Sequence, residues 1–143
     1  MRRVLLAVDG SATSDRAAQR VIDMRKDLVN PDNATLHLLQ VQRPVSRDVS
    51  SLVGSQSLDE YYLERADAAL ASARALLDAA GVAHTDHRRV GDPGSTIANV
   101  ASAEGCGLIV MGTRGLGSHT AALIGSVAQK TVVYATVPVL LVK

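Results

Sequence analysis

The chain has 143 residues, a formal net charge of +1 and a hydrophobic fraction of 47%. This length and composition are typical of one globular domain with a sizeable core, so we expect a single domain over residues 1–143 and exclude a disordered chain. The small net charge and an aromatic fraction of only 2% argue against nucleic acid as a partner. Because no apolar stretch is long enough to span a bilayer, no membrane partner is expected either.

The cysteine content bears on the cellular compartment. Cys106 is the single cysteine, which excludes an intrachain disulfide and favours a reducing, cytoplasmic location. The apolar run at residues 4–8 follows two arginines but is too short for a signal peptide. Cys106 lies between two glycines just before another apolar run, so we expect a small buried side chain there rather than a catalytic thiol.

Apolar runs alternate with helical patterns along the chain. Five strands are predicted, at residues 4–8, 34–41, 83–90, 107–111 and 139–142. Helical patterns cover residues 17–29, 58–80, a short stretch after Pro93, and 125–134. Ser11 or Ser14 is expected to cap the first helix and Gly81 to end the second. Residues 42–57 show little pattern and are expected to form a mobile surface segment.

This alternation predicts a three-layer α/β fold, with a parallel sheet and helices on both faces. If the strands have the order 3-2-1-4-5, the first and fourth strands are neighbours. Ligands of such folds bind beyond the carboxyl ends of the strands, where the strand order reverses. Asp9, directly after the first strand, then faces the glycine-rich loop that follows the fourth.

The histidines are not expected to bind a metal. His37 is interpreted as a packed or edge-facing residue, because no second metal-type residue sits at a matching spacing. In the polar strand at residues 83–90, His84 and Asp86 share one face while His87 points to the other. We therefore expect that strand to be solvated at a sheet edge, and His119 to be an exposed loop residue.

A glycine-rich stretch follows the fourth predicted strand. Glycines at positions 112, 115 and 125, with Ser126, match the spacing G-x2-G-x9-G-[S/T]. The Walker A pattern fails for want of a lysine, G-x-G-x-x-G fails at Thr120, and G-x-S-x-G is absent. A strand, a glycine loop and a new helix start together predict a cradle for an anion such as phosphate.

This motif resembles that of the ATP-binding branch of the universal stress protein family. The resemblance covers essentially the whole chain and includes residues 8–11, Gly91-Asp92-Pro93 and the closing residues 138–142. It implies a single-domain Rossmann-like fold of the adenine nucleotide alpha hydrolase-like type, a homodimer formed through Val139–Val142, and ATP with Mg²⁺ as the ligand. The implied nucleotide-binding residues are Ala7, Val8, Asp9, Val41, Met111, Gly112, Arg114, Gly115, Gly125, Ser126 and Val127.

Within that set the resemblance suggests separate roles. Asp9 and its two preceding neighbours lie against the adenosine, Val41 contacts adenine through its backbone, and Met111 and Gly112 line the ribose and the phosphate entrance. The remaining residues hold the phosphates, with Arg114 supplying the positive charge that a Walker loop takes from lysine. Which residues cover the adenine is left open by the sequence.

Three functions are compatible with these features. The first is a nucleotide-dependent stress-response or signalling module with an unknown protein partner and at most slow ATP hydrolysis. The second is a nucleotide hydrolase or adenylyl-transfer enzyme on the same fold, for which no catalytic residue and no metal-binding acidic pair is evident. The third is a dimeric scaffold that keeps the loop without binding a nucleotide.

Overall fold

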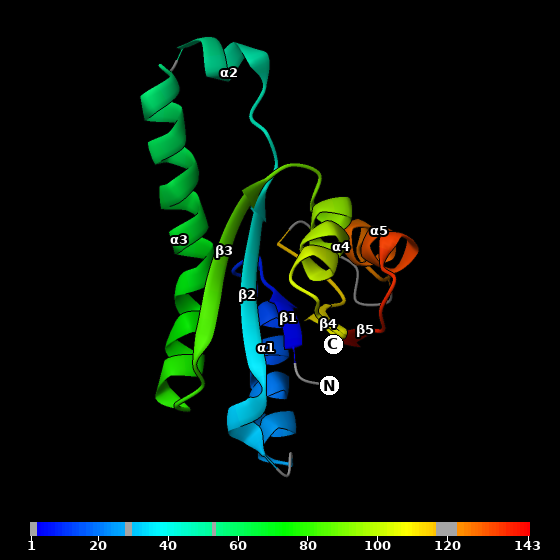
Figure 1. Ribbon diagram of the computed structural model, residues 1–143. Helices are drawn as coiled ribbons and strands as arrows, with labels where there is room; N and C mark the ends of the chain where they lie inside the picture. Colours follow the sequence, from blue (N-terminus) through cyan, green and yellow to red (C-terminus); the bar gives the residue numbers. More distant parts are fainter. Residues whose placement is uncertain (1–2, 28–29, 53, 117–122) are drawn as a thin grey trace.

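The computed structural model describes residues 3–27, 30–52, 54–116 and 123–143. Its centre is a sheet of five parallel strands in the order β3-β2-β1-β4-β5 (Figure 1). The strands are β1 (Arg3–Ala7), β2 (Thr35–Gln42), β3 (His84–Val90), β4 (Leu108–Gly112) and β5 (Val139–Val142). The predicted order is therefore confirmed, and β1 and β4 are neighbours, with Ala7 paired to Met111.

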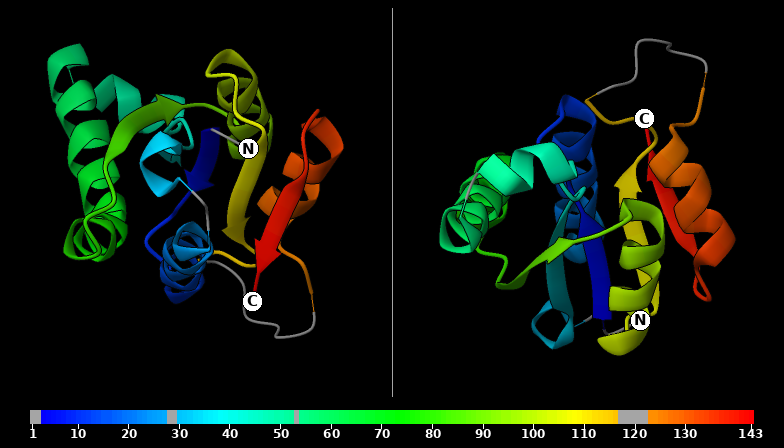
Figure 2. Two further views of the ribbon diagram at one scale, coloured as in Figure 1. Left: turned by 60° about the horizontal axis from the view of Figure 1, so that its bottom comes forward. Right: turned by 90° about the horizontal axis from the view of Figure 1, so that it is seen from above.

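Helices cover both faces of the sheet (Figure 1, Figure 2). Two of them, α1 and α3, pack on one face, whereas α4 and α5 pack on the other. The helical elements are α1 (Ala12–Lys26), the 3-10 turn η1 (Pro31–Asn33), α2 (Arg47–Leu52), α3 (Ser55–Ala79), α4 (Pro93–Ala103) and α5 (Ser126–Tyr134). None of the helices in the described ranges is both long enough and apolar enough to cross a membrane.

The two faces of β1 belong to different cores. Leu6 and the following Val8 pack with α1 and α3, whereas Leu5 and Ala7 pack with α4 and α5. Because successive side chains of a strand point to opposite faces, a strand covered on both sides needs an unbroken apolar run. With no Phe or Trp in the chain, leucine, valine, isoleucine and alanine supply most of both cores. Cys106 is also buried, as expected, and this burial raises the pKa of its thiol.

Helix ends follow local sequence signals. Ser11 caps α1, since its Oγ accepts a hydrogen bond from the Ser14 N–H at 3.2 Å. Gly81 follows α3 with φ at +68°, a conformation that glycine adopts without strain. The expectation for residues 42–57 is wrong in part, because they contain the exposed helix α2 and the start of α3.

Asp92 joins the two helices on the α4/α5 face. As the N-cap of α4, its carboxylate accepts a hydrogen bond from the Ser95 N–H at 3.2 Å. Lys130 of α5 donates to the same carboxylate at 2.9 Å. The hydrogen bond from Lys130, followed by those from Ser95, lowers the pKa of Asp92 from 3.8 to about 2.

The replacement Asp92→Asn tests this charge, because asparagine still caps a helix but has no carboxylate. A carboxyl group whose pKa is lower in the folded state stabilises the fold above its unfolded pKa and loses that effect as pH falls through its folded pKa. We therefore expect the variant to be less stable near neutral pH, with the difference shrinking between pH 3.8 and about 2. Urea midpoints measured across this range check it. A difference that stays constant with pH contradicts it.

Candidate functional site

A cavity of about 1080 Å³ opens at the carboxyl ends of the central strands. It lies where the strand order reverses. From β1 the chain continues to β2 on one side of the sheet, whereas β4 lies next to β1 on the other side. Its volume lies just above the usual range for small-molecule sites, about 300–1,000 Å³. All residues of the predicted nucleotide site line this cavity: Ala7, Val8, Asp9, Val41, Met111, Gly112, Arg114, Gly115, Gly125, Ser126 and Val127.

Asp9 connects the loop after β1 to the loop after β4. Its Oδ1 accepts hydrogen bonds from the Ser11 N–H at 3.0 Å and from the Ser14 hydroxyl at 2.8 Å. Its Oδ2 accepts the Leu116 N–H at 3.1 Å, across 107 residues of chain. The predicted approach of Asp9 to the glycine loop is thus confirmed. This one carboxylate links the loop after β1 to the loop after β4.

The glycines of the loop lie where a side chain has no room. A Cβ on Gly115 collides with Oδ2 of Asp9, and one on Gly112 lies 2.5 Å from Cγ2 of Thr13. A Cβ on Gly125 lies 3.3 Å from the carbonyl oxygen of Thr113, the same oxygen that accepts the Gly125 N–H at 2.6 Å. The spacing of the motif therefore reflects the close approach of the loop backbone to Asp9, to Thr13 and to its own residue Thr113.

The start of α5 forms one end of the cavity wall. Its N-cap is Gly125, which offers no capping side chain, whereas Ser11 and Asp92 cap α1 and α4. The first N–H groups of any helix have no partner within the helix and carry the positive end of its dipole. With the Ser126 hydroxyl beside them, these groups form a site suited to an anion.

The opposite wall comes from α3, which the sequence analysis did not assign to the site. Tyr61, Arg65, Ala68 and Ala69 line the cavity, and the Arg65 guanidinium carbon lies 5.6 Å from the centroid of the Tyr61 ring. Their spacing of four, three and one residues places them on one face of a helix. That spacing is visible in the sequence, but only the fold shows that this face looks onto the carboxyl ends of the strands.

Charge in the cavity is predominantly positive. Arg43, Arg65 and Arg114 line it, and among the described lining residues Asp9 supplies the one carboxylate. Arg43 follows β2 and, like Arg65, was missed by the sequence analysis. Three guanidinium groups against one carboxylate favour an anionic ligand, since guanidinium pairs well with phosphate. Apolar side chains of Val41, Val45 and Ile97 provide a surface on which a planar base can pack.

The histidines lie partly as predicted. His37 is packed, with 7% of its surface exposed, and His84 shares a face with Asp86. The expectation of a solvated strand is wrong for His87, which is 9% exposed and lies against His37. No metal-type residue sits at a matching sequence spacing from His37, but the fold brings His87 and Glu104 close to it from other elements. His119 lies outside the described residues.

The fold and the cavity define a Rossmann-like α/β protein with a cavity at its switch point. The family model of the universal stress protein family matches residues 1–143. A universal stress protein of Thermus aquaticus is 36% identical over 143 residues, which cover 99% of this chain and 98% of that relative. The chain therefore belongs to the universal stress protein family.

Solved structures with the same fold include two that are 26% identical to this chain. The hypothetical protein MJ0577 superposes with a TM-score of 0.81, covering 99% of this chain and 95% of its own. A universal stress protein in complex with cAMP superposes with a TM-score of 0.70, covering 99% of this chain and 97% of its own. The Rossmann-like topology predicted from the sequence is shared with both.

Proposed function

We propose that the cavity binds ATP together with Mg²⁺, and that the protein acts as a nucleotide-dependent stress-response or signalling module within one domain, residues 1–143. The observation that carries this proposal is the junction of Asp9, the glycine loop and the start of α5 in one positively charged cavity. The cAMP complex of a relative 26% identical to this chain supports an adenine nucleotide as the ligand.

The chemistry of the lining divides the cavity into two parts. The apolar side chains of Val41 and Val45 and the ring of Tyr61 on α3 suit adenine. The N–H groups that begin α5, the Ser126 hydroxyl and Arg114 suit the phosphates. Asp9 lies between the two parts, where the adenosine passes into the phosphate chain.

The same lining favours binding over rapid hydrolysis. Asp9 is the one carboxylate among the described lining residues, and both of its oxygens already accept hydrogen bonds. Mg²⁺ is commonly held by one or two carboxylates together with phosphates and water, so here the phosphates and water would supply most of its ligands. With Asp9 beside the sugar, none of the described lining residues offers a carboxylate to the terminal phosphate as a general base, so we expect hydrolysis to be at most slow.

Assembly and location are part of the same proposal. The outer side of β5 pairs with no strand in the described chain, and its residues Val139–Val142 are all apolar. Exposed apolar edges pair readily with other strands, so a homodimer through β5 would cover this edge. The proposal also includes a cytoplasmic location and a further, unidentified protein partner that would respond to the bound nucleotide.

The first test identifies the nucleotide released by acid from the purified protein, followed by calorimetric titration with Mg-ATP and with adenosine. We expect stoichiometric adenine nucleotide or micromolar binding. Arg114→Ala should weaken Mg-ATP about tenfold or more, because a hydrogen bond to a charged group contributes about 1.5–3 kcal/mol, and should leave adenosine affinity almost unchanged. Arg20→Ala, on the exposed surface of α1, is the control.

The other two functions predict different outcomes of this test. A protein that releases no nucleotide and gives no heat on titration is a scaffold in which the glycine loop serves only its own packing. Fast turnover of Mg-ATP that is abolished by Arg114→Ala identifies a hydrolase. Equal loss of adenosine and ATP in Arg114→Ala contradicts the proposed position of the phosphates.

A further inference from the structure

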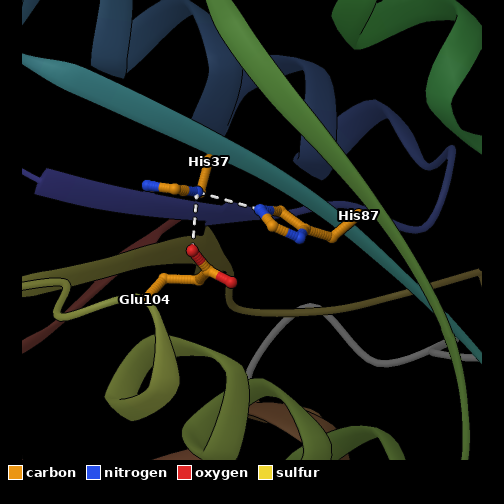
Figure 3. Close-up of side chains that lie close together, drawn as sticks. All are labelled: His37, His87 and Glu104. Atoms are coloured by element: carbon orange, nitrogen blue, oxygen red, sulfur yellow. Dashed lines mark hydrogen bonds and ion pairs between the residues drawn. The ribbon is translucent and has the colours of Figure 1, made fainter.

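A second cluster of polar side chains lies away from the nucleotide cavity. His37 Nδ1 lies 2.9 Å from His87 Nε2 and 3.9 Å from Glu104 Oε2 (Figure 3). One ligand-type atom from each residue falls within 4.8 Å of the other two. The side chains of His37 and Glu104 are 9% and 35% exposed, so the cluster is reached from solvent on the side of the carboxylate. None of the three residues lines the nucleotide cavity.

Three elements bring these residues together. In the parallel pair β2–β3, His37 is paired with Thr85 and Leu39 with His87, so the two imidazoles are diagonal neighbours on one face. That face also carries Leu39 in the core beneath α4 and α5. Glu104 ends α4, and Arg3 holds its backbone by donating to its carbonyl oxygen at 3.0 Å. The sheet therefore fixes the backbone of both histidines, and the glutamate side chain makes the largest movement.

We infer that His37, His87 and Glu104 form a binding site for a divalent transition metal of the Zn²⁺ class. Two imidazole nitrogens and one carboxylate are a ligand set that Zn²⁺ takes, with water in the fourth position. Nitrogen ligands select against Mg²⁺ and Ca²⁺, which prefer oxygen. The site is independent of the proposed nucleotide function, because it uses other residues on another part of the sheet.

The distances require only a small rearrangement. Tetrahedral ligands at 2.0–2.1 Å from Zn²⁺ are about 3.3 Å apart. The two imidazole nitrogens, at 2.9 Å, must separate slightly, and the carboxylate oxygen at 3.9 Å must approach. The partial exposure of Glu104 leaves its side chain room for that approach, while the imidazoles adjust by ring rotation.

The hydrogen bond between the two imidazole nitrogens needs a proton on one of them, and a bound metal ion would displace that proton. Burial, opposed by Glu104 and reinforced by the neighbouring His37, lowers the pKa of His87. Histidine coordinates a metal through a ring nitrogen that carries no proton. An apolar surrounding also limits competition from water around the ligands.

The test measures Zn²⁺ binding to the full, nucleotide-free chain by competition with a chromophoric chelator. We expect one Zn²⁺ per chain with a micromolar or tighter dissociation constant, weakened about 100-fold by His87→Gln and about 10-fold by Glu104→Gln. Co²⁺ should give the visible absorption bands of a four-coordinate nitrogen and oxygen site, and Mg²⁺ should not compete. Zn²⁺ should also raise the melting temperature of the natural chain by more than that of Glu104→Gln, since stabilisation by a ligand falls as its dissociation constant rises.

His84→Gln is the matched control. His84 lies on the same strand as His87 but on the opposite face, where it contacts the carboxylates of Asp78 and Asp86. This variant should bind Zn²⁺ as the natural chain does. Because Glu104 is partly exposed at a helix end, its replacement leaves the fold intact even if His87→Gln unfolds the chain. Absence of stoichiometric binding, or binding lost in His84→Gln and kept in Glu104→Gln, overturns the inference.

Discussion

Replacing Gly125 by valine is expected to weaken Mg-ATP binding by roughly 5- to 150-fold, the range that corresponds to about 1–3 kcal/mol of overpacking. A Cβ at this position lies 3.3 Å from the Thr113 carbonyl oxygen and 3.5 Å from the Arg114 Cα. The contact with the Thr113 oxygen is tighter than an ordinary van der Waals contact and its partner is backbone, so valine fits only if the loop shifts slightly from the start of α5. Calorimetric titration with Mg-ATP measures the loss.

Gly54→Val provides a matched control for this variant. Both glycines are helix N-caps with nearly the same backbone, φ −58° and ψ 156° at Gly54 against φ −63° and ψ 158° at Gly125. A Cβ on Gly54 meets no atom within 4 Å, and Gly54 does not line the cavity. Gly54→Val should therefore bind as the natural chain does. Equal binding by both valine variants shows that the phosphates are held elsewhere.

Much of the architecture could be predicted because its signals are local. Residues 4–8 form an apolar run that a two-sided strand requires, and Ser11 and Gly81 stand at the ends of helices. The alternation of strands and helices then leaves few topologies, since crossovers between parallel strands are right-handed. The approach of Asp9 to the glycine loop followed from that topology alone and is confirmed by the hydrogen bond from Leu116.

The wall formed by α3 was missed for a different reason. Alternating patterns report which face of a helix is apolar, and in α3 the residues Leu70, Ala73 and Leu77 mark that face. Its first turns extend beyond the sheet toward α2 (Figure 1). There the face bearing Tyr61 and Arg65 looks onto the cavity rather than onto a core. The length of a helix relative to the sheet is a tertiary property that periodicity does not report.

The burial of His87 also depends on tertiary structure. The strand His84–Val90 is rich in polar residues, which favours a solvated edge. Arg88 fits that expectation, since it is exposed and paired with Asp67. The opposite face carries His87 against His37 and near Glu104. Sequence spacing within one strand gives no indication of a partner 50 residues away.

The charges of the cavity explain why its ligand should be a nucleotide rather than an uncharged nucleoside. Arg43, Arg65 and Arg114 come from three separate segments, and their convergence on a cavity with a single described carboxylate favours polyanions. Arg65 and Arg114 lie on opposite sides of the cavity, one on α3 and one in the glycine loop. An adenosine that fills the apolar part alone leaves these guanidinium groups without a counter-charge.

Asp9→Ala is expected to lower the affinities for AMP and for Mg-ATP by the same factor, about 10- to 100-fold. Removing the carboxylate breaks the hydrogen bonds from the N–H groups of Ser11 and Leu116, and a hydrogen bond to a charged group contributes about 1.5–3 kcal/mol. The loop after β1 and the glycine loop are then no longer held in a fixed position relative to each other. Because Asp9 is proposed to lie beside the adenosine that AMP and ATP share, the loss should not depend on the number of phosphates.

Asp9→Asn separates this positioning role from the charge. The amide keeps an oxygen that accepts from Ser11 and Ser14, but its NH₂ group faces the Leu116 N–H and cannot accept from it. The variant should therefore retain the turn after β1 and lose the link to the glycine loop, giving an intermediate affinity for both nucleotides. If the negative charge of Asp9 mainly repels phosphate, Asp9→Asn binds Mg-ATP more tightly while AMP changes little. Titrations of both variants with AMP and Mg-ATP distinguish the two cases. Tighter binding of Mg-ATP alone would show that Asp9 lies beside the phosphates and not beside the adenosine.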